Sequence, residues 1–275
     1  MRALSLARAT PNDMDKVLKT IPLEHREACA RAIERASRAC ERWDCEASDF
    51  VDPSTASSIE RAVRGTVGDE CAMELWGGYA SAERKRVVFA RADANDVDRA
   101  KQYVKALRVE GNFMFDPASH GDFLGAILNT GIVRGVVGDI LVSGERGADV
   151  LCAPEMCGFL VEALKSVRTV KVSVKEVNVG ELKVPAPKVE EINTTEASTR
   201  LDAIASAGFR VSRSKFTDMI ASGDVKVNWK EVSKGNMDVV ANDVISCRGK
   251  GRIEVKEINP AKKEGRFAIR LVRFV

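Results

Sequence analysis

One short segment near the carboxyl end combines hydroxyl and cationic side chains at the start of a predicted helix. The run Ser212-Arg213-Ser214-Lys215 leads into an apolar stripe of Phe216, Met219 and Ile220 at helical spacing. Ser212 is a good N-cap, and a helix start presents unpaired amides with a partial positive charge. Because the stripe must face the core, the cations and Thr217 point outward. This combination is suited to binding phosphate groups.

A second cationic segment lies further along the chain, where two glycines separate the basic residues of Arg248-Gly-Lys-Gly-Arg252. Glycine spacing lets the backbone and the cations approach a phosphodiester together. Between the two segments, Val225-Lys-Val-Asn-Trp229 is typical of a strand that leads into a turn. Trp229 either stacks on a base or packs on its own domain. We expect the helix start and the glycine-spaced loop to lie side by side on one exposed face.

The charge of the chain is distributed unevenly around these segments. Residues 198–275 contain sixteen Lys or Arg and nine Asp or Glu, which gives +7 and leaves −4 on the remainder of a chain whose total is +3. Such asymmetry is the footprint of a polyanionic partner, most often a nucleic acid. A solvated basic surface without a partner remains the alternative.

The elements that position these residues are predicted from periodicity and turn signals. Helices are expected from Pro22 to Cys45 and from about Ala56 to Val63, with a new N-cap within Asp52-Pro-Ser-Thr55. The resulting fold class is α+β, with an N-terminal helical segment, a ferredoxin-like domain and a basic C-terminal module. The predicted domains are an N-terminal helical subdomain over 1–68, a ferredoxin-like or RRM-like α/β domain over 69–180, a proline-punctuated linker over 181–197 and the C-terminal module over 198–275.

The middle domain is expected to follow the order β-α-β-β-α-β between residues 103 and 177. Its central strands would be Tyr103–Val109 and Asp149–Cys152. An RRM that binds RNA in the common way carries aromatic residues on these two strands, which stack bases. Only Tyr103 is available, at one end. A structural role or a different binding face is therefore favoured for this domain.

The basic C-terminal module resembles the S4-type RNA-binding domain. The similarity is carried by Arg200-Leu-Asp202, Ser212-Arg-Ser214, Ile220-x-x-Gly223-x-Val225-x-Val227-Asn228 and Asp243-x-Ile245. The family pattern has Gly after the Asn, where this chain has Trp229. The upstream chain resembles YlmH-type proteins, and among them the photosystem II S4 domain proteins. The similar segments are Gly77-Gly-Tyr-Ala-Ser-Ala-Glu-Arg84, Gly111-Asn-Phe-Met-Phe-Asp-Pro117 and His120-Gly-Asp122. In the last of these segments the family often has Arg in place of the Gly.

The resemblance implies a ribosome-associated protein that binds structured RNA, such as rRNA or tRNA, with the large ribosomal subunit as a candidate partner. The residues expected to contact RNA are Arg200, Arg210, Ser212, Arg213, Lys215, Thr217, Lys226, Asn228, Trp229, Lys230, Arg248, Lys250 and Arg252. The mildly acidic N-terminal body would orient the S4 domain or contact a protein partner.

No catalytic motif emerges from the sequence, so we expect a non-enzymatic protein without a cofactor or a metal. The glycines of Gly131-x-x-x-Gly135-x-x-Gly138 have the wrong spacing for a nucleotide-binding loop, and no P-loop or nucleophile-elbow motif occurs. His120 is expected to cap a helix. Two alternatives stay open, namely an RNA-modifying enzyme with an unfamiliar site around His120 or Asp139, and a scaffold in thylakoid or photosystem assembly.

Cysteine usage and the N-terminal composition bear on location. Seven cysteines without a CxxC pair indicate a reducing compartment and argue against structural zinc. No uncharged apolar run approaches the roughly 18–20 residues of a membrane helix. Residues 1–10 are rich in Arg, Ser and Ala and lack acids, as transit peptides do. With the resemblance, this favours a chloroplast, and a bacterial cytoplasm is the alternative.

Overall fold

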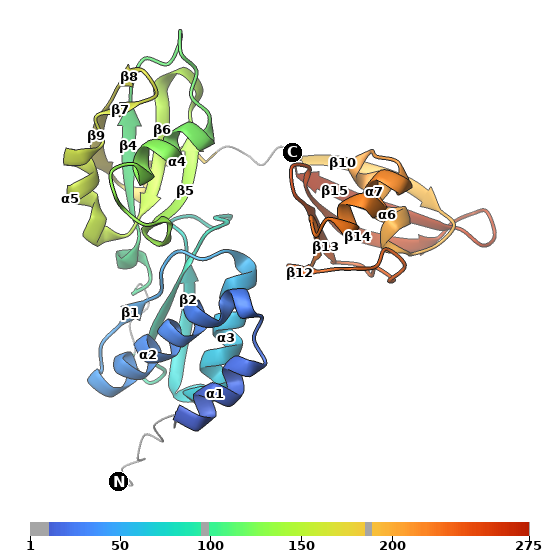
Figure 1. The fold of residues 1–275 in the computed structure, drawn as a ribbon, viewed down its shortest axis with the longest axis horizontal. Helices are drawn as coiled ribbons and strands as arrows, with labels where there is room; N and C mark the ends of the chain where they lie inside the picture. The colour runs from blue at the N-terminus through green and yellow to red at the C-terminus, as the bar shows by residue number, and fades with distance from the viewer. Residues whose placement is uncertain (1–10, 95–98, 185–188, 275) are drawn as a thin grey trace. The chain divides into compact units, whose positions relative to one another are not determined.

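The computed structural model describes residues 11–94, 99–184 and 189–274, and the chain divides into two compact units (Figure 1). The first unit spans Met1–Val184 and the second spans Pro185–Val275. The ten residues with transit-peptide composition lie outside the described residues. No helix in the described ranges has both the length and the apolar character needed to cross a membrane.

The first unit begins with helices that pack around a common core. They are α1 Pro11–Lys19, α2 Arg26–Arg42 and α3 Pro53–Thr66. The N-cap of α3 is Asp52, whose side chain accepts hydrogen bonds from the amides of Ser54 and Thr55 at 2.9 and 3.0 Å. Pro53 occupies the first helical position, where its missing N–H costs nothing. The stop and new cap predicted in this segment are therefore carried by Asp52 and Pro53.

A three-stranded antiparallel sheet completes this core. Its strands are β1 Glu46–Ala47, β3 Arg86–Arg91 and β2 Cys71–Trp76, in the order β1-β3-β2. Phe89 and Val87 of β3 are buried in the same cluster as Ile33 and Ile59 of the helices. The sequence predicts β2 and β3 as part of the following domain, whereas the structure packs them under α2 and α3. They are short apolar strands, and periodicity alone does not reveal which helices cover them.

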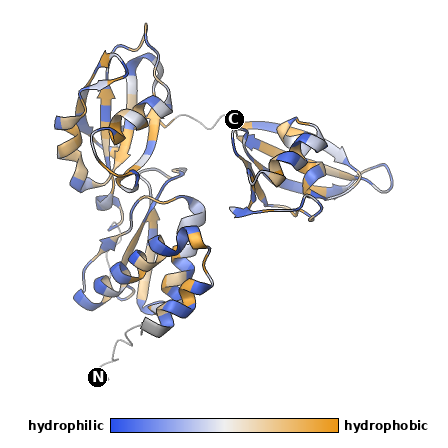
Figure 2. Cartoon of the chain, viewed as in Figure 1, coloured by the Kyte–Doolittle hydropathy of each residue, from blue (hydrophilic) through white to orange (hydrophobic). Residues whose placement is uncertain are grey.

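The second half of the first unit has the predicted β-α-β-β-α-β order. The elements are β4 Lys105–Glu110, α4 His120–Leu128, β5 Val137–Val142, β6 Gly147–Cys152, α5 Pro154–Ala163 and β9 Ser173–Val177, with the small hairpin of β7 Ser166–Val167 and β8 Val170–Lys171 before β9. The sheet order is β5-β6-β4-β9 and all its pairs are antiparallel, so β4 and β6 are central as predicted. Figure 2 colours these two strands hydrophobic over much of their length, and every residue of β6 is buried.

The second unit is a six-stranded antiparallel sheet with two helices. Its elements are β10 Val189–Glu196, α6 Leu201–Phe209, α7 Arg213–Ala221, β11 Val225–Val227, β12 Lys230–Glu231, β13 Val244–Cys247, β14 Gly251–Pro260 and β15 Phe267–Phe274, with the sheet order β10-β15-β14-β13-β11-β12. Residues 189–196, predicted as part of a linker, form an edge strand that pairs along its whole length with β15. Its pairing partner lies some seventy residues away, so local composition could not indicate it.

The core of the second unit lies between the helices and one face of the sheet. Phe209 of α6 and Phe216 of α7 stack with their ring centroids 6.0 Å apart, and Ile253 and Leu271 of the sheet are fully buried beside them. Gly208 is required here for close approach, because a Cβ would lie 2.6 Å from the Ile253 Cδ1 atom. Helix α6 continues one residue past Gly208 and closes at Arg210 in a left-handed conformation. Helix α7 ends two residues before Gly223, which has φ of +75°.

Short 3-10 turns link several of these elements. They lie at Leu23–His25, Gly68–Glu70, Lys101–Tyr103, Arg134–Val136, Gly144–Arg146 and Val179–Glu181. The first of them replaces the opening turn of the helix predicted from Pro22. That helix ends at Arg42, because Trp43 adopts a left-handed conformation with φ of 57°.

Candidate nucleic-acid interface

The start of α7 has the cap and the outward cations expected from its sequence. The Ser212 hydroxyl accepts a hydrogen bond from the Lys215 amide at 3.2 Å. Phe216 and Ile220 are buried and Met219 is half-buried, so Arg213 and Lys215 are exposed. Thr217 is also exposed, but its hydroxyl donates back to the Arg213 carbonyl at 2.9 Å. The helix start therefore offers cations and amides more readily than the Thr217 hydroxyl.

Three of the predicted cations pair with carboxylates of their own unit. Arg213 donates to Glu196 at 3.1 Å, and Arg210 pairs with Glu190 of the same strand, β10. Arg200 is the N-cap residue of α6, and it pairs with Asp202 at 2.8 Å. Surface ion pairs of this kind contribute only about 0–1 kcal/mol. A phosphate can therefore compete for each of these guanidinium groups.

The turn between β13 and β14 holds the glycine-spaced basic residues. Arg248 is exposed and its amide donates to the Asp224 carbonyl at 2.9 Å, just beyond the end of α7. Lys250 is half-buried. The Arg252 guanidinium lies 4.5 Å from the centre of the Phe274 ring. Gly251 has φ of +84°, and a Cβ there would lie 2.6 Å from the Phe274 carbonyl oxygen, so only glycine fits at this position.

The turn between β11 and β12 is a two-residue hairpin loop that places Trp229 in a strained conformation. Asn228 and Trp229 have φ of 48° and 63°, and Val227 pairs with Lys230. This left-handed pair is typical of type I′ turns, which favour glycine at the second position. The Asn228 side chain donates to Asp243 at 2.7 Å and accepts from the Val244 amide at 3.0 Å, which fixes the turn. Trp229 is half-buried and Lys230 is exposed.

These groups do not form the single cluster expected from the sequence. The helix start and the β13–β14 turn lie at opposite ends of α7, which is roughly 13 Å long at 1.5 Å per residue. The β11–β12 turn contacts the other end of β13, through Val244. The expectation that the helix start and the glycine-spaced loop lie side by side is therefore wrong, because α7 separates them.

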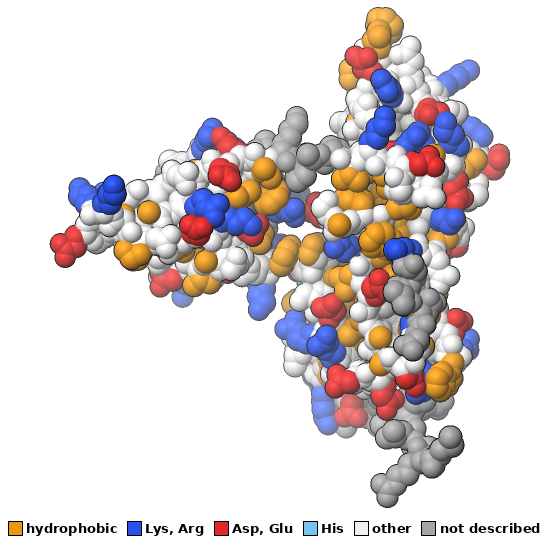
Figure 3. Space-filling model, turned by 180° about the vertical axis from the view of Figure 1, so that it is seen from behind, with side chains coloured by type: hydrophobic (Ala, Val, Ile, Leu, Met, Phe, Trp, Pro, Cys, Tyr) orange, Lys and Arg blue, Asp and Glu red, His pale blue; other side chains and the backbone are white. Residues whose placement is uncertain are grey.

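Register does bring two of the predicted residues into one row. Lys226 pairs with Ser246, and Ser246 pairs with Arg252, so the three side chains share one face of the sheet. Among the described residues, no ion pair involves Lys215, Lys230 or Arg248, and all three are exposed. Figure 3 shows basic side chains interspersed with acidic ones over this unit. The candidate interface is therefore a set of three cationic turns around α7 and β13.

The sequence reasoning missed the acidic residues that shape these turns. Glu190 and Glu196 lie on a strand that was predicted to be a linker, and each pairs with a predicted RNA-contacting arginine. Asp243 orients Asn228 and also accepts from the Val240 amide at 2.8 Å. The Asp243-x-Ile245 motif was the one available signal for this role.

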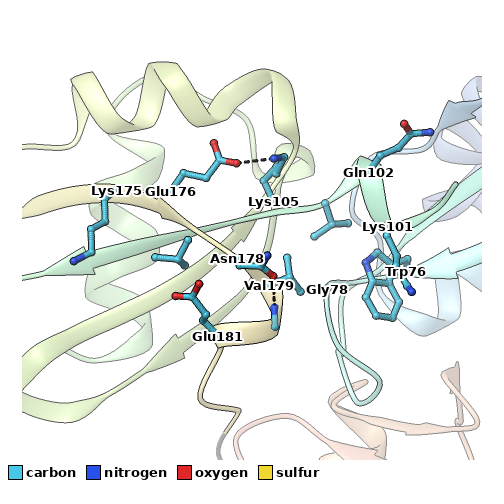
Figure 4. Close-up of a pocket in the computed structure, with 13 residues that line it drawn as sticks. Trp76, Gly78, Lys101, Gln102, Lys105, Lys175, Glu176, Asn178, Val179 and Glu181 are labelled. Atoms are coloured by element: carbon cyan, nitrogen blue, oxygen red, sulfur yellow. Dashed lines mark hydrogen bonds and ion pairs between the residues drawn. The ribbon is translucent and has the colours of Figure 1, made fainter. Parts of the chain in front are cut away.

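A cleft of the first unit beside β4 and β9 does not gather reactive groups. It encloses about 1100 Å³ and is lined by Trp76 and by residues of β4 and β9 (Figure 4). Its Lys105 is paired with Glu176 at 2.6 Å, and the Asn178 side chain accepts from the Gly180 amide at 2.8 Å. Across the three described ranges, no group of three or more His, Cys, Asp or Glu could hold a metal ion.

The two residues considered for catalysis are Asp139, whose carboxylate is held by hydrogen bonds, and His120, which lies at an exposed helix start. Asp139 accepts hydrogen bonds from the Tyr79 hydroxyl at 2.7 Å and from the amides of Glu83 and Arg84 at 2.7 and 3.0 Å. Burial and the bond to Asp139 raise the pKa of Tyr79. His120 is exposed at the start of α4, whose N-cap is Ser119 in a reciprocal capping box with Asp122, so His120 does not cap this helix as predicted.

Three family models match consecutive parts of the chain. The model described as YlmH, N-terminal matches residues 24–94, and the putative RNA-binding domain in YlmH matches residues 100–181. The S4 domain model matches residues 199–245. These matches follow the division into α2–β3, the β-α-β-β-α-β sheet and the α6–β13 region. The chain is therefore similar, part by part, to YlmH-type S4-domain proteins.

Two known proteins resemble most of this chain. The ribosome-associated protein quality control protein P2 of Bacillus subtilis is 28% identical over 264 residues, which cover 94% of this chain and 99% of that protein. A solved structure, the cell division protein ylmH from Streptococcus pneumoniae, covers 60% of this chain and 96% of its own, with a TM-score of 0.50 and 21% identity. The second likeness concerns the fold alone.

Proposed function

We propose that this chain is a non-enzymatic RNA-binding protein that associates with ribosomes and contacts structured rRNA or tRNA through its second unit, whose described residues 189–274 are called the S4 unit below. The observation that carries the proposal is the set of three exposed turns whose cations Lys215, Lys230 and Arg248 have no ion pair among the described residues. The matches to the RNA-binding and S4 family models and the printed name of the Bacillus relative support the ribosomal setting.

The test is a double charge reversal, Lys215→Glu with Arg248→Glu, in the full chain. Each lysine or arginine that neutralises a phosphate adds about 0.7–0.9 to the slope of log affinity against log salt. The double variant should therefore bind ribosomal RNA much more weakly and with a slope lower by about 1–2. The matched control is Lys262→Glu with Lys263→Glu, an equal change of charge on exposed residues outside the three turns. Equal losses in both variants would show that only net charge matters.

The absence of catalysis is tested separately. The hydrogen bonds that occupy Asp139 and the exposed position of His120 support a binding role. Incubating the full chain with bulk RNA and the usual methyl and nucleotide donors should leave the RNA unmodified by mass spectrometry. A modified nucleoside that disappears with Asp139→Asn would establish the enzyme alternative.

The ribosomal partner and the chloroplast location need their own measurements. Co-sedimentation with isolated ribosomal subunits should place the wild-type chain in the large-subunit fraction and leave the Lys215 and Arg248 variant at the top of the gradient. The chloroplast location rests on the resemblance and on the composition of residues 1–10. A fluorescent fusion to the end of the complete coding sequence tests it, and a cytoplasmic signal would remove it.

A further inference from the structure

The loop between β4 and α4 carries two exposed apolar side chains at its tip. Met114 is 55% exposed and Phe115 is 88% exposed, whereas Phe113 is fully buried and packs on Phe123 with ring centroids 5.2 Å apart. In Figure 1 this green loop forms the tip of the unit, and Figure 3 shows hydrophobic side chains at the same apex with both acidic and basic ones below them. The loop therefore points one phenyl ring almost entirely into solvent.

Several contacts hold this loop in place. The Asp116 carboxylate pairs with Arg168 at 2.8 Å and accepts a hydrogen bond from the Thr169 hydroxyl. On the other side, the Phe113 amide donates to the Glu145 carbonyl at 3.0 Å. These contacts thus connect the β4–α4 loop to two other turns of the domain, one at Glu145 and one at Arg168 and Thr169. Phe115 is presented by a fixed backbone, so little conformational entropy would be lost when a ligand stacks on it.

A polar groove lies next to the same turn, along α4. It encloses about 560 Å³, and Asn129, Lys165, Ser166 and Arg168 contribute to its lining. Lys165 is exposed, and no ion pair involves it within the described ranges. A Cβ at Gly125 would meet no atom within 4 Å, so a strand of ligand can approach the helix backbone here. The groove offers cations and amide or hydroxyl groups, which suit a phosphodiester backbone, although the Asp122 carboxylate also lines it and lies 3.6 Å from the Arg168 guanidinium.

The sheet of this domain cannot serve as the stacking platform. All residues of β6 are buried, and no aromatic residue lies on β4 or β6. Tyr103, the aromatic residue expected at one end of β4, donates its hydroxyl to the Cys45 carbonyl at 2.6 Å. Any RNA contact made by the residues that the RNA-binding family model matches must therefore lie outside this sheet. The tip loop is the part of this range that combines an exposed aromatic ring with neighbouring cations.

We propose that the end of the domain formed by Phe115, Lys165 and Arg168 is a second RNA contact, distinct from the S4 unit. Phe115 stacks on an unpaired base, and Lys165 with Arg168 takes phosphates of the same RNA in the groove along α4. This inference rests on the proposed RNA binding. A protein partner fits less well, because the apolar tip consists of only two side chains and the adjoining groove is lined by two cations, one carboxylate and several neutral polar groups.

The first test is Phe115→Ala in the full chain, with affinity measured on ribosomal RNA. Stacking on one base is worth enough that affinity should fall about fivefold or more, with no change in salt dependence or melting temperature. The matched control is Phe159→Ala, which removes a 44% exposed ring from α5 of the same domain and should bind as wild type. Equal affinities for wild type, Phe115→Ala and Phe159→Ala would overturn the assignment.

A second measurement separates this contact from the S4 contact and from a protein site. Lys165→Ala should lower the slope of log affinity against log salt by about 0.7–0.9, independently of the Lys215 and Arg248 variant. Ultraviolet crosslinking to RNA should leave nucleotide adducts on the peptide that contains Phe115. If the S4 variant loses binding but Phe115→Ala and Lys165→Ala do not, only this second contact fails. If the wild-type chain binds no RNA, the proposed function fails with it.

Discussion

Glu196 accepts a hydrogen bond from Arg213 over 3.1 Å, and this contact joins the first strand of the S4 unit to the start of its second helix. Glu196 lies opposite Phe267 at one end of the β10–β15 pair, and Glu190, near the other end, holds Arg210 in the same way. Strand β10 thus pairs two arginines with its own carboxylates. An RNA phosphate that binds either arginine must displace a carboxylate of the protein.

Removing the charge of Glu196 should therefore strengthen RNA binding. Glu196→Gln keeps the size of the side chain but no longer competes for Arg213, so affinity should rise by a few fold at low salt and by less at high salt, where charges are screened. Filter binding over a salt series measures the change. The control is Glu264→Gln, which removes an exposed charge without an ion pair among the described residues. An unchanged affinity for Glu196→Gln would mean that Arg213 does not contact RNA.

The helix start also shows what the sequence could and could not predict. Ser212 as the cap, the buried stripe of Phe216 and Ile220, and the stop at Gly223 all follow from local rules, and the structure has each of them. The pairing of Arg213 with Glu196 could not be predicted, because Glu196 lies on strand β10. The only apolar residue of that strand that faces the core is Ile192, so the sequence does not identify it as a strand. That strand is stabilised by pairing with β15, a contact that no local pattern encodes.

A similar limit applies to the placement of the cations. The sequence indicated correctly that Arg213 and Arg248 belong to one basic module. It could not indicate that Arg248 follows the far end of α7, since that depends on the bond between the Arg248 amide and the Asp224 carbonyl. The exposure of Phe115 could not be predicted either. It lies beside Phe113, which is buried, and nothing in the local sequence distinguishes the two rings.

The substitution Trp229→Gly should affect RNA affinity and folding stability differently. A non-glycine residue in the left-handed region costs about 1–2 kcal/mol, and glycine removes that strain from the β11–β12 turn. The loss of the half-buried indole offsets part of the gain, so the melting temperature should stay the same or rise. If the indole stacks on a base, RNA affinity should fall about fivefold or more. A lower melting temperature with unchanged affinity would show that Trp229 packs on its own domain.

The two glycines of the β13–β14 turn should differ in their tolerance of alanine. Both have positive φ, of +71° at Gly249 and +84° at Gly251, so each substitution pays about 1 kcal/mol or more for the left-handed backbone. A Cβ at Gly249 meets no atom within 4 Å, whereas one at Gly251 lies 2.6 Å from the Phe274 carbonyl oxygen. Gly251→Ala should therefore lower the free energy of opening of β14 and β15 by about 1–3 kcal/mol more than Gly249→Ala.

Amide hydrogen exchange of β14 and β15 in the full chain measures both substitutions. Gly251→Ala should also weaken RNA binding, because displacing Phe274 disturbs the support of the Arg252 guanidinium 4.5 Å from its ring. Equal protection of the two alanine variants would indicate that the end of β15 shifts away without cost, and the steric argument would then be wrong.

The anchor of the tip loop should weaken in acid. The hydrogen bond from the Thr169 hydroxyl, with Arg168 beside it, holds the pKa of Asp116 below its usual range. The hydroxyl and amide of Ser119 do the same for the pKa of Asp122. Each carboxylate therefore contributes stability that is fully present above its ordinary pKa of about 4 and is lost as the pH falls through the lower folded value. Protection of the Thr169 amide from hydrogen exchange, corrected for intrinsic rates, should decrease from pH 5 to pH 3.

The variant Asp116→Asn checks the cause of that decrease. The amide still accepts a hydrogen bond from Thr169 but cannot pair with Arg168, so the variant should show weaker protection at pH 5 and a shallower decline toward pH 3. Glu145→Gln, on the neighbouring turn, provides the control, because Glu145 is exposed and takes part in the loop through its backbone carbonyl. If Asp116→Asn retains the wild-type decline, protonation elsewhere releases the loop. Since this loop carries Phe115, its release should also reduce the stacking contribution to RNA binding at the lower pH.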